Sequence, residues 1–145
     1  MKLNIDDKTM NGKSLNKAKG DEGETVAAEF LEKIGYRIIK KNFKKGRHEI
    51  DIIAESESGN LNFIEVKARF KSRFGKPYEA VNKRKLSTII DVSNFFLMQS
   101  SASNIKNDNK MINYGVISIE YIERGSIKLI FFENILEWKI KAIAV

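Results

Sequence analysis

Two apolar segments joined by a short polar turn constrain the fold of this chain more than any other part of its sequence. The segments are HEIDIIAE (48–55) and LNFIEVKA (61–68). Side chains along a strand alternate between the two faces of a sheet, so each face carries every second residue. The even positions are uniformly apolar, and we expect them to face one core: Ile50, Ile52, Ala54, Ile64, Val66 and Ala68. The pattern predicts a hairpin whose register is set by its buried face.

The odd positions of the same hairpin change character along its length. Near the turn they are apolar, and at the far end they are charged: Glu49, Asp51, Glu65 and Lys67. Two neighbouring carboxylates repel each other unless a cation lies between them. Oxygen ligands without histidine or cysteine suit a hard ion such as Mg²⁺ or Mn²⁺. Lys67 would then orient a water or stabilise the charge on an attacked phosphate, as in metal-assisted phosphodiester hydrolysis.

The alternative for this charged end is purely structural. Lys67 would form an ion pair with Asp51 or Glu65, and the other carboxylate would lie in solvent. Composition narrows the remaining chemistry, because the chain has no cysteine and a single histidine, His48. Disulfides, thiolate metal sites and zinc sites built from several histidines are therefore excluded.

The segment GDEGETVAAEFLEKIG (20–35) predicts a helix, because its apolar residues follow the i, i+3, i+4 spacing. Acidic residues crowd the expected first turn, where the helix dipole favours them, and Gly35 suits the C-terminal cap. Glu24 lies near the edge of the apolar arc. It can therefore reach over a sheet edge towards Asp51 and Glu65.

The expected elements follow the order α-β-β-β-α-β-β, which is typical of an α/β fold with a mixed central sheet flanked by helices. Beyond the first helix and the hairpin, they are a strand at 36–43, a helix at roughly 79–100, and strands at 112–122 and 125–135. A polar loop is expected at 99–111, and the tail, 136–145, fits either a strand or a short helix. Residues 1–18 are expected to form a flexible N-terminal arm, and residues 19–145 a single domain.

The chain carries a net charge of +7, and its basic residues concentrate on both sides of the hairpin. This distribution favours an anionic partner, with nucleic acid the leading candidate. The predicted phosphate contacts in these stretches are Arg47, Lys71, Arg73 and Lys76. No segment reaches membrane-spanning length and none resembles a signal peptide, so we expect a cytoplasmic protein that does not bind membranes.

Three motifs in this order resemble the E…D…ExK signature of the PD-(D/E)xK nuclease superfamily: Glu24, EID at 49–51 and EVK at 65–67. More narrowly, the chain resembles the YraN/UPF0102 family, small bacterial proteins similar to Holliday junction resolvases. The matching stretches are GDEGETVAAEFLEKIGYRIIKKNF, HEIDIIAE, FIEVKAR and FGKPYEAVNKRKL. The resemblance implies a restriction-endonuclease-like core and DNA as the substrate.

The resemblance also implies roles for the matching residues. Asp51 and Glu65 would be ligands of Mg²⁺ or Mn²⁺, Lys67 the catalytic lysine, and Glu24 the helix acid that completes the catalytic set. Lys85 and Arg69 match basic positions of the family, and we expect both to contact nucleic acid. Two places depart from the family pattern. His48 replaces the usual glycine before the EID motif, and Asn113, Tyr114 and Gly115 replace an Arg-Phe-Asp stretch.

These observations favour a metal-dependent endonuclease that acts on branched or structured DNA. The alternative is a nucleic-acid-binding module on a nuclease-like scaffold, because basic surfaces bind phosphates without any metal. A third reading is a scaffold for protein partners that uses the carboxylates structurally. A junction presents two symmetric strands, so a homodimer would form through the second helix or the apolar C-terminal strand.

Overall fold

The structure of the chain is a computed structural model, and it describes residues 12–70, 82–100, 110–122, 125–136 and 140–144. The predicted α/β class is confirmed, with one strand more than expected. The elements in chain order are α1 (Gly12–Lys33), β1 (Arg37–Lys45), β2 (His48–Glu55), β3 (Leu61–Phe70), α2 (Lys83–Ser100), β4 (Ile112–Tyr121), β5 (Ile127–Phe132) and β6 (Ile140–Ala144).

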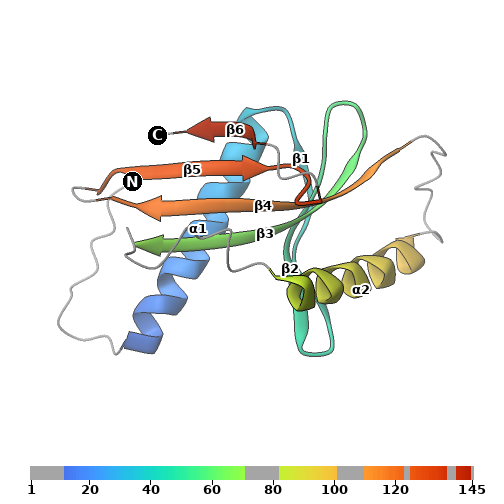
Figure 1. Cartoon of the computed structure of the whole chain (residues 1–145), viewed down its shortest axis with the longest axis horizontal. Coiled ribbons are helices and arrows are strands. Elements are labelled where there is room, and N and C mark those ends of the chain that lie inside the picture. The colour runs from blue at the N-terminus through green and yellow to red at the C-terminus, as the bar shows by residue number, and fades with distance from the viewer. Residues whose placement is uncertain (1–11, 71–81, 101–109, 123–124, 137–139, 145) are drawn as a thin grey trace.

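The strands form one mixed sheet in which sequence neighbours are also spatial neighbours, in the order β1-β2-β3-β4-β5-β6 (Figure 1). β3 and β4 are parallel, and the other neighbouring pairs are antiparallel. Parallel strands need a long crossover connection, and α2 lies in the connection between β3 and β4. The predicted mixed central sheet with flanking helices is therefore confirmed.

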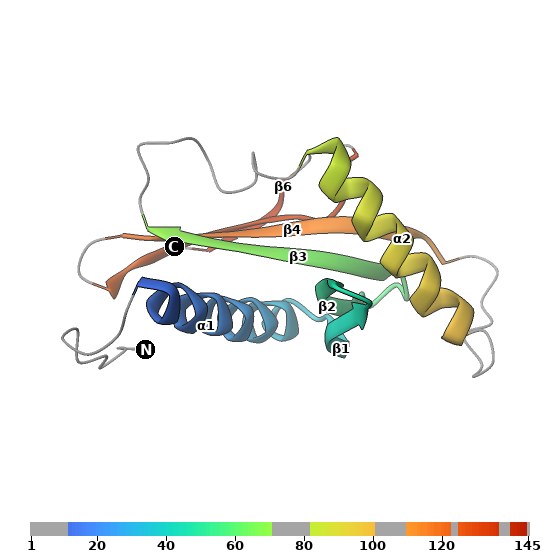
Figure 2. The same ribbon diagram turned by 90° about the horizontal axis from the view of Figure 1, so that it is seen from below.

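The two helices lie on opposite faces of the sheet and bury separate cores (Figure 2). Ala27 and Leu31 of α1 pack with the even-numbered side chains of β2 and β3, including Ile52 and Ile64. On the other face, α2 covers odd-numbered residues, and Phe63 forms an edge-to-face ring contact with Phe96. Both faces of the hairpin are buried, which explains why its sequence is apolar at nearly every position near the turn.

One even position departs from the predicted face. Ile52, Ala54 and Ile64 pack on the α1 side as expected, but Ile50 packs in the cluster covered by α2. A regular strand would place Ile50 and Ile52 on the same face. The prediction for Ile50 is therefore wrong. The ladder between β2 and β3 ends at Ile52, so Ile50 lies in the part of β2 that is no longer paired with β3.

α1 begins earlier than its apolar spacing predicted. It extends back to Gly12, so residues 12–18, assigned to the N-terminal arm from sequence, are helical, and no acidic residue lies in the first turn. Residues 1–11 lie outside the described residues. Neither helix in the described ranges is long and apolar enough to cross a membrane.

The predicted C-terminal end of α1 is confirmed in detail. Gly35 has a φ of 94°, a conformation that side chains with a Cβ rarely adopt. The N–H of Gly35 donates to the carbonyl of Glu32 at 3.1 Å, and the N–H of Tyr36 donates to that of Leu31 at 2.9 Å. This is the Schellman arrangement, and Tyr36 and Leu31 both pack in the core beneath it.

In the C-terminal half, the structure decides between the strand and the helix predicted for the tail. Other predictions for this half fall on residues outside the described ranges. The tail forms β6, an antiparallel partner of β5, so the strand reading is confirmed there. The start of the predicted second helix (79–81), most of the polar loop (101–109) and part of the predicted turn (123–124) lie outside the described residues.

The Asn-Tyr-Gly stretch has a structural explanation. Asn113 is buried, and its side-chain amide donates to Oδ1 of the buried Asn62 on β3 at 3.2 Å. A Cβ on Gly115 would lie 3.0 Å from the carbonyl oxygen of Phe132 and 3.1 Å from that of Glu133. This departure from the family pattern therefore serves the packing of β4 between its neighbours.

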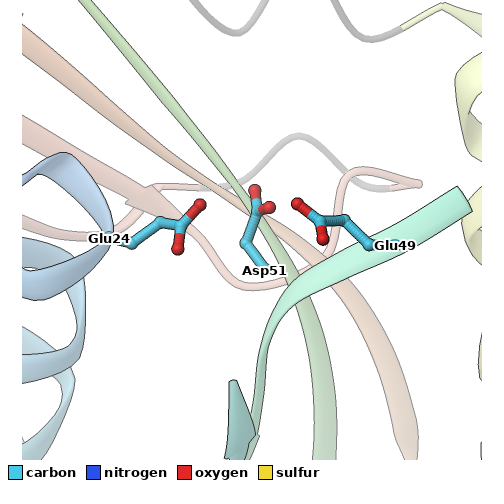
Figure 3. A group of neighbouring side chains, drawn as sticks. All are labelled: Glu24, Glu49 and Asp51. Atoms are coloured by element: carbon cyan, nitrogen blue, oxygen red, sulfur yellow. The ribbon is translucent and has the colours of Figure 1, made fainter. Parts of the chain in front are cut away.

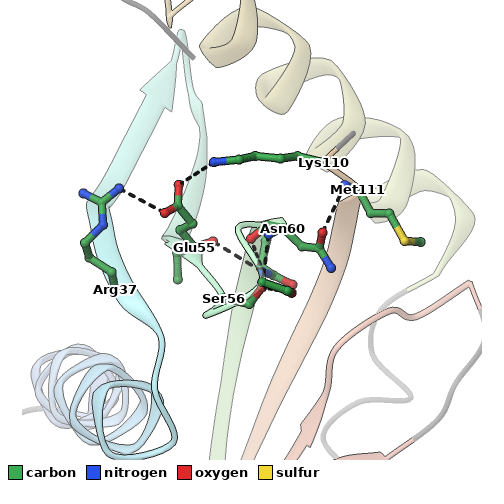
Figure 4. Close-up of polar contacts among 9 residues, drawn as sticks. Arg37, Glu55, Ser56, Asn60, Lys110 and Met111 are labelled. Carbon is green, nitrogen blue, oxygen red and sulfur yellow. Dashed lines mark hydrogen bonds and ion pairs between the residues drawn. The ribbon is translucent and has the colours of Figure 1, made fainter. Parts of the chain in front are cut away.

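The turn end of the β2–β3 hairpin is held by paired charges and a closed hydrogen-bond network (Figure 4). Glu55 forms ion pairs with Arg37 at 3.3 Å and with Lys110 at 3.5 Å. Ser56 and Asn60 close the turn through Ser56 N–H to the Asn60 carbonyl at 2.9 Å. Asn60 Oδ1 also accepts the N–H of Met111 at 3.2 Å, which joins the turn to the start of β4.

Candidate functional site

The other end of the same hairpin is open, because β2 and β3 separate there. Their ladder of paired residues ends at Ile52 and Ile64. Beyond this point, the Asp51 carboxylate of β2 accepts the backbone N–H of Val66 of β3 at 2.7 Å. The β1–β2 pair then turns away from β3 (Figure 1). We call this opening the fork.

Three carboxylates meet at the fork (Figure 3), and we call them the acidic cluster: Glu24 from α1, and Glu49 and Asp51 from β2. One oxygen from each lies within 4.8 Å of the others. Glu24 reaches this position because α1 approaches β3 very closely at the preceding residue. A Cβ on Gly23 would lie only 2.8 Å from the Cβ of Ala68, so glycine allows the approach.

Asp51 is the buried member of the acidic cluster, whereas Glu24 and Glu49 are half-buried and Glu49 also forms an ion pair with Lys44 at 3.8 Å. Asp51 is 7% exposed, and burial raises its pKa from 3.8 to about 7, with further increases from Glu65, Glu24 and Glu49. The hydrogen bond from Val66 opposes this shift. Burial also raises the pKa of Glu24, and the nearby Glu49 adds to that effect. Among the described residues, no cation forms an ion pair with Asp51, so its charge is uncompensated.

Beside the acidic cluster lies a carboxylate that is fully paired. Glu65 is 5% exposed, and its Oε1 lies 3.1 Å from Nζ of Lys67 and 3.2 Å from Nζ of Lys85. Alternation along β3 places Glu65 and Lys67 on one face, which α2 covers. The side-chain oxygen of Asn82 accepts the N–H of Lys85 at 3.0 Å and caps the N-terminus of α2. This cap holds Lys85 in the first turn of the helix.

The structure thus gathers five of the residues selected from sequence at the fork: Glu24, Asp51, Glu65, Lys67 and Lys85. The ion pair predicted by the structural alternative, Lys67 with Glu65, is present, but Asp51 is buried and not in solvent. Of the two predicted ligands, Asp51 belongs to the acidic cluster. Glu65 lies outside the cluster but near Asp51, and two lysines pair with it.

The predicted nucleic-acid contacts are more dispersed. Arg47 and His48 are exposed where the β1–β2 turn leads into β2, and Arg69 lies two residues beyond Lys67 on β3, opposite Glu120. Lys71, Arg73 and Lys76 lie outside the described residues.

Two residues at the fork were given no role from sequence. Glu49 carried a usable signal, because it lies two residues before Asp51 and strand alternation directs both to one face. Asn42 carried none. It acts to lower the pKa of Glu24, which lies 18 positions away on a different element, so only the packing of β1 beside α1 brings the two residues near each other.

The fold and the fork define a class of protein: a small mixed-sheet α/β protein with a buried acidic cluster and two lysines at a strand fork. Carboxylate oxygens alone form a donor set that suits hard divalent cations. The uncompensated charge of Asp51 fits such an ion, because a cation between these carboxylates would remove their repulsion.

Comparison with known proteins gives the family. The family model described as "Uncharacterised protein family UPF0102" matches residues 23–119. A UPF0102 protein of Clostridium perfringens (strain SM101 / Type A) is 42% identical over 111 residues, which are 75% of this chain and 90% of that protein. One from Clostridioides difficile (strain 630) is 37% identical over 109 residues, with the same coverage of 75% and 90%. This chain belongs to the UPF0102 family.

A third relative gives a similar match. A UPF0102 protein of Persephonella marina (strain DSM 14350 / EX-H1) is 38% identical over 101 residues, which are 70% of this chain and 82% of that protein. The family match begins at Gly23 and ends at Ile119, so it includes the acidic cluster, both lysines that hold Glu65, and most of the parallel β3–β4 pair.

Proposed function

We propose that this protein is a metal-dependent endonuclease that hydrolyses phosphodiester bonds in DNA, with branched or structured DNA as its substrate. The observation that carries the proposal is the fork itself. There, the buried Asp51 faces further carboxylates on one side, and a carboxylate held by Lys67 and Lys85 lies beside it. Structural ion pairs alone do not require an uncompensated buried acid, which costs stability.

Asp51, Glu24 and Glu49 would hold Mg²⁺ or Mn²⁺, and Glu65 would join them if its lysines turned towards a phosphate. The ion would supply a polarised water and neutralise charge on the phosphate. Asp51 is already fixed for this role, because the backbone of Val66 holds its carboxylate at 2.7 Å. This contact leaves the second oxygen of Asp51 available to a ligand.

The lysines would act on the substrate. In hydrolysis, water forms a new bond to phosphorus while the bond from phosphorus to the leaving oxygen breaks, and negative charge grows on the phosphate oxygens. Lys67 is 30% exposed at its side chain and Lys85 is 34% exposed, so both ammonium groups can meet a phosphate from solvent. Their charge would stabilise the transition state more than the ground state, which is the requirement for catalysis.

The surface beside the fork suits a polyanion. Lys40, Lys41 and Lys44 are exposed on β1, and Lys83 and Arg84 are exposed at the start of α2. Exposed basic side chains bind phosphates independently of sequence, and such binding weakens as salt is raised. These residues would hold DNA against the fork without reading its bases.

The test is cleavage of labelled branched and linear DNA with Mg²⁺ or Mn²⁺ by purified protein. We expect metal-dependent cleavage that Asp51→Ala and Lys67→Ala each abolish. Glu55→Gln is the matched control, because Glu55 is a carboxylate at the closed end of the same hairpin. Equal cleavage by wild type and both fork variants would assign the activity to a contaminant and remove the proposal.

The pairing of Glu65 favours a second candidate, a nucleic-acid-binding module without turnover. Both lysines already neutralise Glu65 without a metal, so the fork could remain in this state while basic residues bind phosphates. DNA binding that follows salt concentration, ignores Mg²⁺ and leads to no cleavage would select this candidate over the nuclease.

A further inference from the structure

The β1–β2 pair continues past the fork as a two-stranded ribbon. The ladder between β1 and β2 extends to the pair Lys45 and His48, whereas the ladder between β2 and β3 ends at Ile52. Among the described strands, β2 therefore pairs with β1 alone in this part, and the ribbon projects past α2 (Figure 1). We call residues 44–48, at the end of this projection, the ribbon tip.

The ribbon tip closes through a short turn. Lys45 and His48 are paired, so only Gly46 and Arg47 connect the two strands. Gly46 has a φ of 60°, and among the described residues other than glycine only Asn42 has a positive φ. A two-residue connection with a positive φ at its first residue alone is typical of a type II′ turn, whose twist matches that of the strands. The tip is therefore no wider than two strands.

Side chains at the base of the tip anchor the ribbon on α2. The ring centroid of Phe43 lies 5.1 Å from that of Phe96, edge to face, and 6.1 Å from that of Phe95. Nζ of Lys45 donates to both carboxylate oxygens of Asp91, at 2.8 and 3.0 Å, and lies 5.7 Å from the ring centroid of Phe95. Because a two-stranded hairpin is marginally stable alone, these contacts fix the ribbon before any partner binds and lower the entropic cost of binding.

The ribbon tip presents a positive charge that the protein does not neutralise. Arg47 and His48 are exposed, and a Cβ on Gly46 would have no atom within 4 Å. Lys44 lies 3.8 Å from Glu49, but Arg47 takes part in no ion pair with the residues that the structure describes. An exposed guanidinium at the end of a fixed projection suits a partner that offers hydrogen-bond acceptors and negative charge.

We propose that the ribbon tip enters the major groove of duplex DNA, where Arg47 contacts the base edges. The major groove of B-DNA is about 12 Å wide and admits a two-stranded ribbon, whereas the undistorted minor groove, about 6 Å wide, is too narrow. Paired strands already lie about 4.8 Å apart before their side chains are counted. In the groove, an arginine can donate two hydrogen bonds to O6 and N7 of guanine.

The inference deepens the proposed function, because it takes DNA as the substrate, but it requires neither a metal nor cleavage. The exposed lysines of β1 would attract phosphates of any duplex, since such attraction depends on charge alone. Groove entry depends on shape. The major groove of A-form RNA is deep and narrow, and side chains cannot read it. A tip that enters a groove should therefore strengthen binding to DNA and not to RNA.

The experiment is a fluorescence-anisotropy titration of a short labelled duplex that contains guanine, with EDTA present, by wild type, Arg47→Ala and Arg37→Ala. Arg37 is the matched control, because it is a 71% exposed arginine at the other end of β1. We expect Arg47→Ala to weaken DNA binding roughly tenfold, as is typical of a lost base contact, and Arg37→Ala to weaken it far less. Equal losses in the two variants would overturn the proposal.

An RNA duplex of the same sequence tests the shape argument. On this duplex, Arg47→Ala and Arg37→Ala should cause equally small losses, because each removes one charge and neither residue enters the groove. A tenfold loss in Arg47→Ala on RNA as well would show that Arg47 contacts the phosphates of either duplex, and the proposal would fail.

A modified DNA duplex tests which groove the tip enters. Glucosylated hydroxymethyl groups on the cytosines fill the major groove and leave the phosphates unchanged. Wild type should bind this duplex more weakly than unmodified DNA, and Arg47→Ala should cause no further loss, because the tip can no longer enter. The same tenfold loss in the filled duplex would place Arg47 outside the major groove and overturn the proposal.

Cleavage of the same unmodified DNA with Mg²⁺ separates this inference from the proposed function. A wild type that binds DNA through Arg47 but cleaves none would remove the nuclease and retain the ribbon tip as a DNA contact. Cleavage by a protein whose DNA affinity is the same in Arg47→Ala would retain the nuclease and remove the inference. Wild type that binds no duplex DNA even at low salt would also overturn the inference.

Discussion

The two ends of the β2–β3 hairpin use the same kinds of residue for opposite purposes. At the closed end, Glu55 is partly exposed and pairs with Arg37 and Lys110, so its charge is neutralised. At the fork, Asp51 is almost fully buried and faces Glu65, Glu24 and Glu49. The first arrangement joins strands together. The second stores repulsion that a bound cation would relieve, which is typical of a site for a ligand.

The largest expected difference between the ends is a pH dependence that originates at the fork. Burial raises the pKa of Asp51 from 3.8 to about 7, so the folded protein keeps a proton there that the unfolded chain has lost. The folded state therefore binds more protons between these pH values, and its free energy of unfolding falls as the pH rises through this window. Above this pH window, the free energy of unfolding is lower by on the order of 4 kcal/mol.

Chemical denaturation of metal-free protein between pH 4.5 and pH 8, chosen from this window, measures the effect. The raised pKa of Glu24 acts in the same direction. Asp51→Asn should flatten the profile and stabilise the protein at pH 8, since its amide oxygen can still accept the N–H of Val66. A wild-type profile that is flat, or that rises with pH, would contradict the assignment of an uncompensated acid at the fork.

Metal affinity should give the second-largest difference between the fork and the closed end of the hairpin. We expect Asp51→Asn to weaken Mn²⁺ binding at least about 100-fold, the upper end of the loss caused by removing a supporting contact, because it removes a ligand charge itself. Glu55→Gln should leave the affinity unchanged, because Glu55 lies at the closed end. Calorimetry measures both. Equal losses in the two variants would show that charge anywhere on the hairpin, and not the fork, sets the affinity.

The close approach of α1 to β3 offers a smaller effect on stability. In Gly23→Ala the new Cβ would meet the Cβ of Ala68, and we expect a loss of about 1 to 2 kcal/mol after the better helix propensity of alanine is counted. Gly20→Ala is the matched control, because a Cβ there has no atom within 4 Å and should stabilise the helix slightly. Urea unfolding compares them, and a Gly23→Ala variant as stable as Gly20→Ala would refute the tight contact.

The smallest effect is expected at the closed end. Arg37→Ala removes an ion pair in which the arginine side chain is 71% exposed, and such pairs contribute at most about 1 kcal/mol. Lys110 also remains to pair with Glu55. Thermal or urea unfolding at low and high salt should show a minor change that disappears at high salt. A larger loss would mean that the closed end, too, depends on a specific charge.

Local patterns in the sequence predicted most of the elements and the faces of the hairpin. Alternation identified both strands, and the glycine at position 35 marked the end of α1 through its positive φ. The early start of α1 was missed, because residues 12–19 lack the apolar spacing on which the prediction relied. The tail stayed ambiguous because β6 pairs along one edge with β5, and its short sequence suits either type of element.

The sequence by itself determined the residue types at the charged end of the hairpin and, through its resemblance to a family, which of them to group. Period-two alternation is a local property of the backbone, so it can be read from neighbouring residues. It placed Glu65 with Lys67, and Glu49 with Asp51, before any fold was known.

Tertiary structure alone decided which charged side chains at the fork form ion pairs and which do not. The ladder between β2 and β3 stops at Ile52, α1 brings Glu24 to the fork through Gly23, and α2 brings Lys85 to Glu65. Each of these depends on contacts between residues far apart in the chain. Burial and the summed field of those neighbours, and not the identity of the residue, give Asp51 its raised pKa.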